Sequence, residues 1–401
     1  MRVAFLSREY PPDTAWGGIA AMYYSLASAL ARRGHEVHVV CQAVDTPGDL
    51  IDNGVLVHRV GTNPKRYSAV ARINYSFHAW LKLREIIKRY DIEIVEAAYW
   101  GAEALLYGLS RRTPLAVRVA SSASDVLRTG TYSGIKEQVS LKILSFLEDF
   151  SARRADRVVA TTKGQCAPLI EKLRIDPEKI EVVHHSVDAA KYSYVESDIR
   201  ERLEIPRNTP LVLFVGRLEA RKGVHILCRA IPGIIRTIPA TRFVLVGRDT
   251  NSAPFNGSVK AHIRKQAEDD GFGDHMMFID FLPEDELIKL YSACDLLVIP
   301  SLHESFGLVV LEGMACGRPV VATATGLAPE LGLDGTGGIM VPPGDIGGLA
   351  EAVIRLLSLS DDDKKLAAKT NRELVEAEFS IPEWVDRVVE VYNKALSKTE
   401  Q

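Results

Sequence analysis

Cysteine is scarce in this chain of 401 residues, and its five copies are scattered along the sequence. None of them forms a Cys-x-x-Cys pair, so the pattern indicates neither a zinc site nor a disulfide framework and fits a reducing cytosol. No apolar run approaches the roughly 18 residues that a membrane-spanning helix needs. The opening stretch MRVAFLSREYPP also lacks the longer apolar region of a signal peptide. We therefore expect a cytoplasmic protein.

An excess of charge is absent as well. The formal net charge is −3, which argues against general binding to nucleic acids. No Gly-x-Gly-x-x-Gly follows the first apolar strand, so a nicotinamide cofactor is not indicated. No Asp-x-Asp follows an apolar strand either, and the acidic run at 361–363 falls in a helical tail, where we expect it to be solvated. The sequence therefore predicts no cofactor and no required divalent metal.

Short apolar runs alternate with helical patterns through both halves of the chain. In the first half, strands are expected at 3–7, 37–41, 55–60, 92–95, 115–119, 157–160 and 180–183, and in the second at 211–215, 243–246, 276–279 and 296–299. Such alternation predicts parallel sheets covered by helices on both faces. The polar segment 190–210 ends in IPRNTP and reads as a linker. We therefore expect an α/β protein with domains at 1–190 and 191–381.

The stretch DLLVIPSLHESFGLVVLEGMACGRPVV, residues 295–321, carries the clearest local signals. A buried strand at 296–299 is followed by the polar loop SLHES and then by a helix, for which Gly317 and Pro319 are stop signals. A helix N-terminus at the carboxyl end of a parallel strand is where open α/β sheets bind ligands. The backbone N–H groups near Ser305, Phe306 and Gly307 suit an anion such as a diphosphate.

Two carboxylates bracket that helix start. Glu304 lies in the loop and Glu312 in the helix, and at 1.5 Å rise per residue their axial separation is at most about 12 Å. A carboxylate accepts hydrogen bonds from both hydroxyls of a vicinal diol, which suits a hexose and a ribose. The alternative is that Glu312 is a paired structural residue and Glu304 a solvated loop residue.

Two further strand-to-helix junctions carry residues suited to phosphate. GRLEARKG places Gly216, Arg217 and Lys222 after the strand at 211–215. Arg217 can bind two phosphate oxygens at once, and Lys222 adds a mobile charge, although both residues could equally be surface cations. In the first half, Gly17 and Gly18 let the backbone pass close to a ligand, unless they form a plain turn.

These motifs together resemble a known family. ESFGLVVLE, GMACGRPVVAT and GRLEARKG are similar to the signature of retaining glycosyltransferases of the GT-B fold, family 4, also called glycosyl transferases group 1. The resemblance covers nearly the whole chain. It implies two Rossmann-like domains whose parallel sheets face a central cleft, with a final helix at about 382–401 that packs back on the first domain.

The resemblance also assigns roles to the residues. It implies catalytic roles for Arg217, Lys222 and Glu304, with Glu304 holding the donor sugar and Glu312 the ribose. The implied donor-binding set is Gly17, Gly18, Gly216, Arg217, Lys222, Glu304, Ser305, Phe306, Gly307, Leu308 and Glu312. The expected reaction moves a hexosyl group from a UDP-, GDP- or ADP-sugar to an acceptor hydroxyl. It proceeds with retention of configuration and without a metal.

The chain departs from the family pattern at several positions. The family usually places a His after the strand at 115–119, where this chain has Ala120 or Ser121. The missing His leaves open a nucleotide-sugar-binding protein with weak or no transferase activity, and a GT-B nucleotide-sugar epimerase is a further alternative. The sequence HHSVD replaces the more usual Asn-Gly-Val-Asp. Its His184 and His185 either project into the cleft or are structural.

Residues 65–90 combine basic and aromatic side chains. The segment holds seven Lys and Arg against one Glu, interleaved with five aromatic residues. Such a helix can lie on an anionic membrane, which predicts peripheral contact at the inner membrane face. The alternative is a sheet-covering helix with a solvated basic face.

Overall fold

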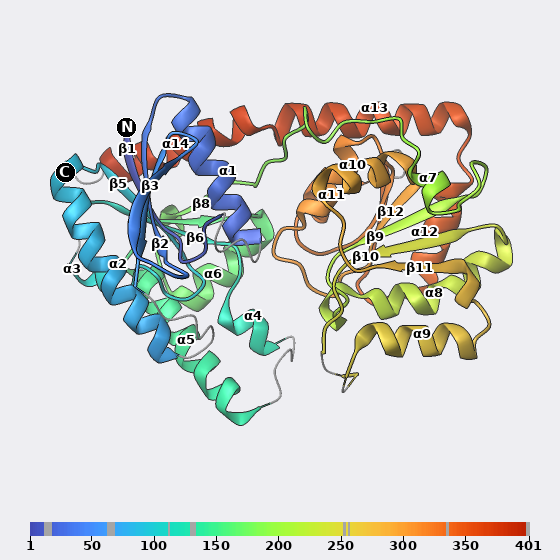
Figure 1. Ribbon diagram of the computed structural model, residues 1–401, viewed down its shortest axis with the longest axis horizontal. Helices are drawn as coiled ribbons and strands as arrows, with labels where there is room; N and C mark the ends of the chain where they lie inside the picture. Colours follow the sequence, from blue (N-terminus) through green and yellow to red (C-terminus); the bar gives the residue numbers. More distant parts are fainter. Residues whose placement is uncertain are drawn as a thin grey trace. The chain divides into compact units, whose positions relative to one another are not determined.

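The computed structural model describes residues 1–11, 18–61, 69–110, 113–128, 134–251, 254–255, 257–333 and 337–397 (Figure 1). The chain divides into two compact units. Unit 1 holds the described residues of Met1–Arg128, Tyr132–His185 and Ile381–Gln401, and unit 2 those of Ser186–Ser380. Each unit is an α/β layer structure, which confirms the predicted fold class.

The sheet of unit 1 has eight strands in the order β3-β4-β2-β1-β5-β6-β7-β8. All neighbours are parallel except β3, which pairs antiparallel with β4. The prediction of a wholly parallel sheet was therefore wrong at this edge. The strands are β1 (Arg2–Leu6), β2 (Glu36–Gln42), β3 (Gly48–Asp52), β4 (Val55–Val60), β5 (Ile94–Ala98), β6 (Leu115–Val119), β7 (Arg157–Ala160) and β8 (Ile180–Val182).

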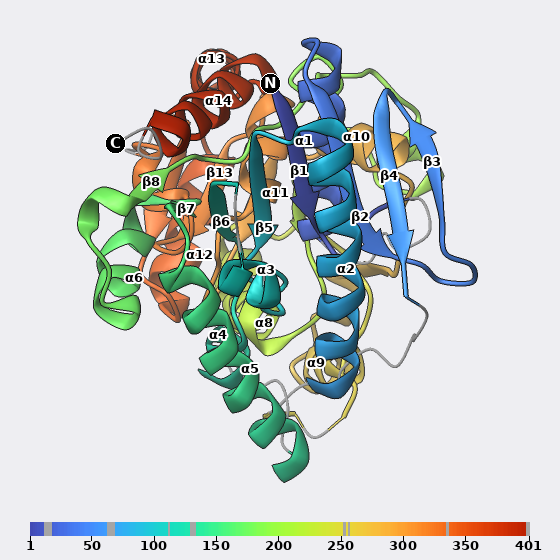
Figure 2. The same cartoon turned by 90° about the vertical axis from the view of Figure 1, so that its left-hand side faces the viewer.

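Helices cover both faces of this sheet because its strands are apolar on both sides. Val3 and Phe5 of β1 pack with α1 (Gly18–Arg32) and α14 (Ile381–Ser397), whereas Ala4 and Leu6 pack with the opposite layer. That layer contains α2 (Ala69–Tyr90), α3 (Leu105–Ser110), α5 (Ile135–Arg153) and α6 (Cys166–Leu173), and α4 (Ala123–Arg128) follows β6. Figure 2 shows α2, α3 and α5 side by side in front of the sheet.

The carboxyl-terminal helix α14 belongs to unit 1 although the chain reaches it through unit 2. Its Tyr392 hydroxyl donates to Glu96 of β5 at 2.8 Å. Glu96 in turn accepts two bonds from Arg118 of β6, at 2.7 and 3.0 Å, and both members of this ion pair are fully buried. A buried charge pair needs further hydrogen bonds to its polar atoms, and Tyr392 supplies one of them to Glu96.

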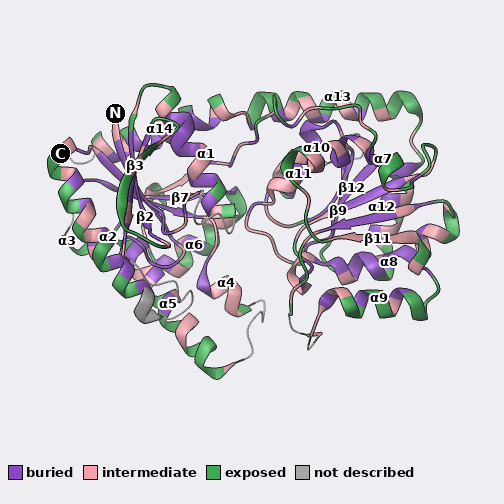
Figure 3. Ribbon diagram, viewed as in Figure 1, coloured by how far each residue is buried: buried purple, intermediate pink, exposed green. Residues whose placement is uncertain are grey.

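The sheet of unit 2 has six strands, all parallel, in the order β11-β10-β9-β12-β13-β14. Figure 3 shows the central strands β9 and β12 buried, the edge strand β11 of intermediate exposure and parts of the covering helices exposed. The strands are β9 (Leu211–Val215), β10 (Arg242–Val246), β11 (Met276–Ile279), β12 (Leu296–Ile299), β13 (Val320–Thr323) and β14 (Gly338–Val341). One face is covered by α8 (Val224–Thr237), α9 (Val259–Asp269) and α12 (Ile346–Leu357), and the other by α10 (Glu284–Ala293), α11 (Leu308–Ala315) and α13 (Asp361–Glu378). A short helix, α7 (Ile199–Arg202), precedes β9.

The strand order of unit 2 reverses at its centre. The chain runs outward from β9 to β10 and β11 on one side, and from β12 to β13 and β14 on the other. The gap between the carboxyl ends of β9 and β12 is therefore the topological switch point, where α/β sheets of this kind bind ligands. Among the described helices, none is both long enough and apolar enough to cross a membrane.

Candidate active site

Two loops meet at the switch point of unit 2. The loop after β9 contains Arg217 to Lys222, and the loop after β12 contains Ser301 to Glu304. They are joined through backbone, because the Leu302 amide donates to the carbonyl of Arg221 at 2.8 Å. The two sequence motifs, about 80 residues apart in the chain, thus form one site.

Gly223 allows the two loops to approach this closely. Its φ is +67°, and a Cβ atom placed there would lie 1.8 Å from the carbonyl oxygen of Pro300. Any side chain would therefore push the β9 loop away from the end of β12. Gly223 was part of the recognised motif, and its physical role is this contact between backbones.

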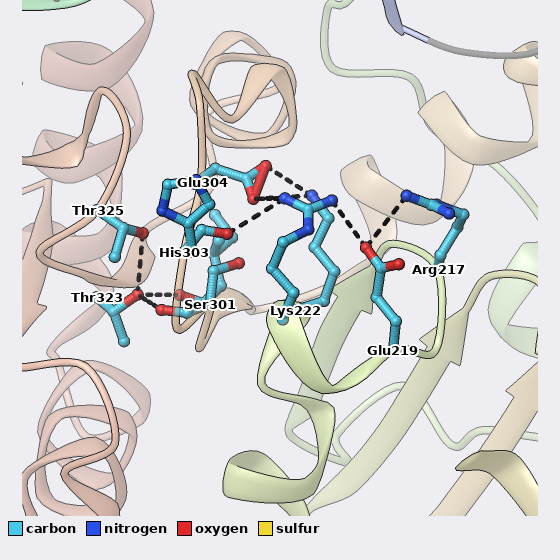
Figure 4. Close-up of polar contacts among 10 residues, drawn as sticks. Arg217, Glu219, Lys222, Ser301, His303, Glu304, Thr323 and Thr325 are labelled. Atoms are coloured by element: carbon cyan, nitrogen blue, oxygen red, sulfur yellow. Dashed lines mark hydrogen bonds and ion pairs between the residues drawn. The ribbon is translucent and has the colours of Figure 1, made fainter. Parts of the chain in front are cut away.

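Lys222 and Glu304 form the centre of the site. The Lys222 ammonium donates to both carboxylate oxygens of Glu304, at 2.6 and 3.0 Å (Figure 4). The side chains are only 18% and 10% exposed, so the pair is largely shielded from water. Arg221 makes a longer contact of 3.4 Å to the same carboxylate. Glu304 is therefore held by two cations, and the alternative of a solvated Glu304 is wrong.

Arg217 lies at the edge of this cluster. Its guanidinium contacts Glu219 at 3.2 Å, and Arg221 donates to the same carboxylate at 2.7 Å. Glu219 is 4% exposed, whereas the Arg217 side chain is 60% exposed. The arrangement fixes Arg217 at one end and leaves the rest of its guanidinium accessible to an anion.

The loop after β13 contacts the start of α11 and fixes its position. Gly307, immediately before the helix, has a φ of +93°. The Leu327 amide donates to the carbonyl of Phe306 at 2.8 Å. Gly326 has a φ of +57°, and a Cβ there would lie 2.4 Å from that same carbonyl oxygen. The segment Ser305 to Leu308 is thus positioned by the backbone of the loop at Gly326 and Leu327.

Glu312 lies within α11 and is partly buried. The Tyr291 hydroxyl of α10 donates to its carboxylate at 2.7 Å. Burial raises the pKa of Glu312, and the hydrogen bond from Tyr291 opposes this shift. Glu312 has an internal partner in this structure, as the alternative interpretation of a paired structural residue expects.

The other residues singled out from the sequence have varied surroundings. Gly216 packs under Gly247, whose added Cβ would lie 1.9 Å from the Gly216 carbonyl oxygen. Gly18 is the first residue of α1 in unit 1, with open space around it, and Gly17 lies outside the described residues. His185 is buried edge-on against Trp384, with ring centroids 6.2 Å apart, so its structural interpretation is correct.

The position of the missing family His lies in the short connection between β6 and α4. Ala120 and Ser121 follow β6, and the Ser122 hydroxyl then accepts from the amide of Asp125 at 3.0 Å in α4. Glu148 of α5 accepts from the amide of Ala123 at 2.9 Å. This segment of unit 1 is therefore held by serine and carboxylate contacts.

Sequence reasoning missed three members of the site in unit 2. Glu219 and Arg221 connect Arg217 with Glu304, and their only sequence signal is the alternation of charge in RLEARKG. Tyr291 is 21 residues from Glu312, and no motif links them. In the described parts of the chain, no group of three or more His, Cys, Asp or Glu side chains is arranged to hold a metal ion.

Comparisons with known proteins agree with this picture. The family model Glycosyltransferase Family 4 matches residues 16–191, and Glycosyl transferases group 1 matches residues 195–373. A D-inositol 3-phosphate glycosyltransferase from Mycobacterium sp. (strain KMS) is 30% identical over 414 residues, covering 99% of this chain and 90% of the relative.

Two solved structures show the same fold. Sucrose-phosphate synthase from Thermosynechococcus elongatus has a TM-score of 0.81 at 23% identity, with 99% of each chain covered. Anabaena Alr3699/HepE, in complex with UDP-glucose, has a TM-score of 0.73 at 22% identity, covering 98% of this chain and 99% of that one.

Proposed function

Because this chain belongs to the glycosyl transferases group 1 of glycosyltransferase family 4 and has the GT-B fold, we propose that it is a retaining, metal-independent hexosyltransferase. It moves a sugar from a nucleotide-diphosphate sugar to an acceptor hydroxyl. The observation that carries the proposal is the shielded contact between Lys222 and Glu304 at the switch point of unit 2.

The reaction requires stabilisation of a leaving nucleoside diphosphate. Negative charge grows on the β-phosphate as the bond from the sugar carbon to the phosphate oxygen breaks. Arg217, with its accessible guanidinium, and Lys222 are the cations that we assign to this charge. One such preorganised donor typically lowers the barrier by about 2.7–4 kcal/mol.

We assign Glu304 to the donor sugar. Its carboxylate can accept hydrogen bonds from two sugar hydroxyls while Arg221 keeps its contact with it and the Lys222 ammonium turns toward the diphosphate. Glu312 is assigned to the ribose and Ser305 to Leu308 to the diphosphate. The attacking acceptor hydroxyl approaches from the face that the leaving group vacates, and the departing phosphate oxygen takes its proton. This front-face course gives retention.

The donor and acceptor classes are also part of the proposal. The loop after β11 borders the base in the family, and here Phe281 is 65% exposed with the guanidinium of Arg248 5.6 Å from its ring centroid. UDP-glucose is the first donor to test, because the Anabaena protein was crystallised with it. The Mycobacterium relative makes an inositol phosphate the first acceptor to test.

We further propose a cytoplasmic protein with peripheral membrane contact through residues 65–90. All five cysteines are free, as a reducing compartment would keep them. In the described part of that segment, Arg84, Lys88 and Arg89 are exposed beside the exposed Phe77.

The proposal is tested by incubating the wild type with UDP-, GDP- and ADP-sugars and measuring nucleotide release with and without acceptor. Nuclear magnetic resonance of the product gives its anomeric configuration, and a chelator tests for a metal. Lys222→Met and Arg217→Gln should each lower turnover by about 10²–10³-fold. Lys365→Met, at a cation 78% exposed on α13, should have no effect.

Four results would contradict parts of this proposal. Donor-induced thermal stabilisation without hydrolysis or transfer on any acceptor would indicate a binding protein. Conversion of the donor to a second nucleotide sugar would indicate an epimerase. An inverted product, or activity abolished by the chelator and restored by a divalent cation, would refute retention or metal independence.

A further inference from the structure

Exposed apolar side chains are concentrated on one layer of unit 1. Of the fifteen large hydrophobic residues that are exposed in the described part of the chain, eight lie on three neighbouring helices. Figure 2 shows these helices, α2, α3 and α5, together on one side of the sheet. The eight residues are Ile73, Phe77 and Leu81 of α2, Leu109 of α3, and Ile135, Val139, Ile143 and Phe146 of α5.

The apolar residues of α5 form a stripe along its outer side. They recur at intervals of four, four and three residues, which places them on one face of a helix. Their exposure is 81% at Ile135, 51% at Val139, 49% at Ile143 and 64% at Phe146. The inner side of the helix has its own apolar contacts through Leu144, which is 5% exposed. The outer stripe is therefore additional to what the fold needs.

A shallow apolar pocket connects α5 with α2. It is lined by Ile73 and Ser76 of α2, Leu105 of α3, and Leu144 and Leu147 of α5, together with Arg72 and the backbone of Gly101 and Ala102. Ile73 belongs both to the pocket and to the exposed stripe of α2. The three helices contact one another, and we call the surface formed by their exposed apolar residues the outer helical face. Contiguous exposed apolar surface of this kind marks an interaction site.

The outer helical face is positively charged although the whole chain has a net charge of −3. Six exposed cations and two exposed acids lie on its two long helices. On α2, Arg84 and Lys88 continue the stripe of Ile73, Phe77 and Leu81 at helical spacing. The exposed cations are Arg84, Lys88, Arg89, Lys136, Lys142 and Arg153, and the exposed acids are Glu85 and Glu137.

The positive charge of the outer helical face distinguishes between two partners that could cover it, a second copy of the chain and a lipid bilayer. A second copy of the chain, related by a two-fold axis, would bring the same cations opposite one another at low dielectric. A bilayer with anionic headgroups would pair with the cations and accept the apolar side chains at the boundary with the acyl chains.

We propose that the outer helical face of unit 1 docks on the surface of an anionic lipid bilayer. This extends the proposed contact of residues 65–90 to α3 and α5, and α5 supplies the most exposed apolar side chains. Phe146 and Ile143 enter the boundary between headgroups and acyl chains, and Arg84, Lys88 and Lys142 pair with lipid phosphates.

The test is flotation of the full chain with vesicles of phosphatidylcholine alone and with added phosphatidylglycerol. We expect binding only to the anionic vesicles, with release at high salt. Arg84→Gln/Lys88→Gln/Lys142→Gln should weaken binding by about a hundredfold, at about fivefold per cation. Ile143→Ser/Phe146→Ser should weaken it by about tenfold or more.

Control variants carry changes of the same kind on unit 2. Lys365→Gln/Lys369→Gln/Arg229→Gln removes three exposed cations, and Leu366→Ser replaces a side chain that is 53% exposed. Both controls should bind anionic vesicles as the wild type does. Thermal stabilisation by UDP-glucose, measured without vesicles, should be the same in all variants, so a failure of the proposed catalytic function is seen separately.

Several outcomes would overturn the docking proposal. They are the absence of binding to anionic vesicles, equal binding to neutral ones, and wild-type binding by the charge variant. A further contradicting outcome comes from light scattering. If the wild type is a dimer and the Ile143→Ser/Phe146→Ser variant is a monomer, a second copy of the chain covers the face. If the serine variant is misfolded, the charge variant alone decides.

Discussion

Replacing Lys222 by Met separates its structural effect from its catalytic effect. In the wild type, Glu304 is 10% exposed and has Lys222 at 2.6 Å and Arg221 at 3.4 Å. Lys222→Met leaves the carboxylate with only the longer contact, and Glu304→Gln leaves the ammonium, which is 18% exposed, without its partner. Each single change therefore strands a charge that is largely removed from water.

The double variant removes both charges together. Charged partners in direct contact are coupled by about 1–3 kcal/mol, because the attraction at this distance is partly offset by the cost of removing both groups from water. Lys222→Met/Glu304→Gln should accordingly be more stable, by about that amount, than the sum of the two single changes predicts. The free energy of unfolding in urea measures this coupling.

Turnover should behave differently. If Lys222 stabilises the leaving diphosphate, its loss raises the barrier by about 2.7–4 kcal/mol, and neutralising Glu304 cannot restore the missing cation. The double variant should then show the higher stability expected from the coupling, and its turnover should still be no higher than that of Lys222→Met. Recovery of turnover in the double variant would refute the catalytic role, because Lys222 would then serve only to hold Glu304. Strictly additive stabilities would refute the structural one.

Gly326→Ala should lower the melting temperature and abolish stabilisation by UDP-glucose, because its Cβ would lie 2.4 Å from the Phe306 carbonyl oxygen; a thermal-shift titration checks this. Tyr392→Phe should cost about 1.5–3 kcal/mol of unfolding free energy in urea, since it removes a bond to a buried carboxylate. Glu96→Gln should cost more, about 3–5 kcal/mol, because its arginine partner stays buried. Burial lowers the pKa of His185 to about 3 from 6.5. The unfolded chain therefore gains a proton first as the pH falls below 6.5, and stability declines by up to about 1.4 kcal/mol per pH unit. The urea midpoint of unfolding should therefore depend less on pH in His185→Leu than in the wild type.

The positions of the two site loops followed from the sequence because they depend on backbone alone. Strands that end just before Gly216 and Pro300 must present their next residues at one edge of a parallel sheet. The spacing of residues in the sequence could not predict which side chains of the two loops contact one another. Arg221 contacts both Glu219 and Glu304 because Gly223 brings the loops together, and a contact between segments 80 residues apart leaves no periodic signal.

The edge strand β3 was missed for a different reason. GDLID has too few apolar residues to read as a strand, because an edge strand in contact with water needs few. A signal was nevertheless present in Asn53-Gly54, both of which have positive φ, at +49° and +80°. Such a pair favours a tight hairpin, which makes β3 and β4 antiparallel.

Helix α5 shows where periodicity itself is ambiguous. Its sequence repeats apolar residues on two faces, so the pattern predicts a helix without telling which face meets the sheet. The structure shows which face is buried, because Leu144 is 5% exposed whereas Phe146 is 64% exposed. An outer apolar face becomes visible only when the inner one has been assigned to the core.

The pairing of Lys222 with Glu304 has a consequence for the proposed donor. A diphosphate that draws the ammonium toward itself weakens the contact that keeps the Glu304 carboxylate satisfied at 10% exposure. A free nucleoside diphosphate has no sugar hydroxyls to replace that contact, whereas a sugar joined to it brings hydroxyl donors for the Glu304 carboxylate. Under the proposed function, the charge pair would therefore favour the intact donor over its leaving group. Part of the specificity would then lie in a penalty for incomplete ligands, and re-formation of the pair would assist release of the diphosphate after transfer.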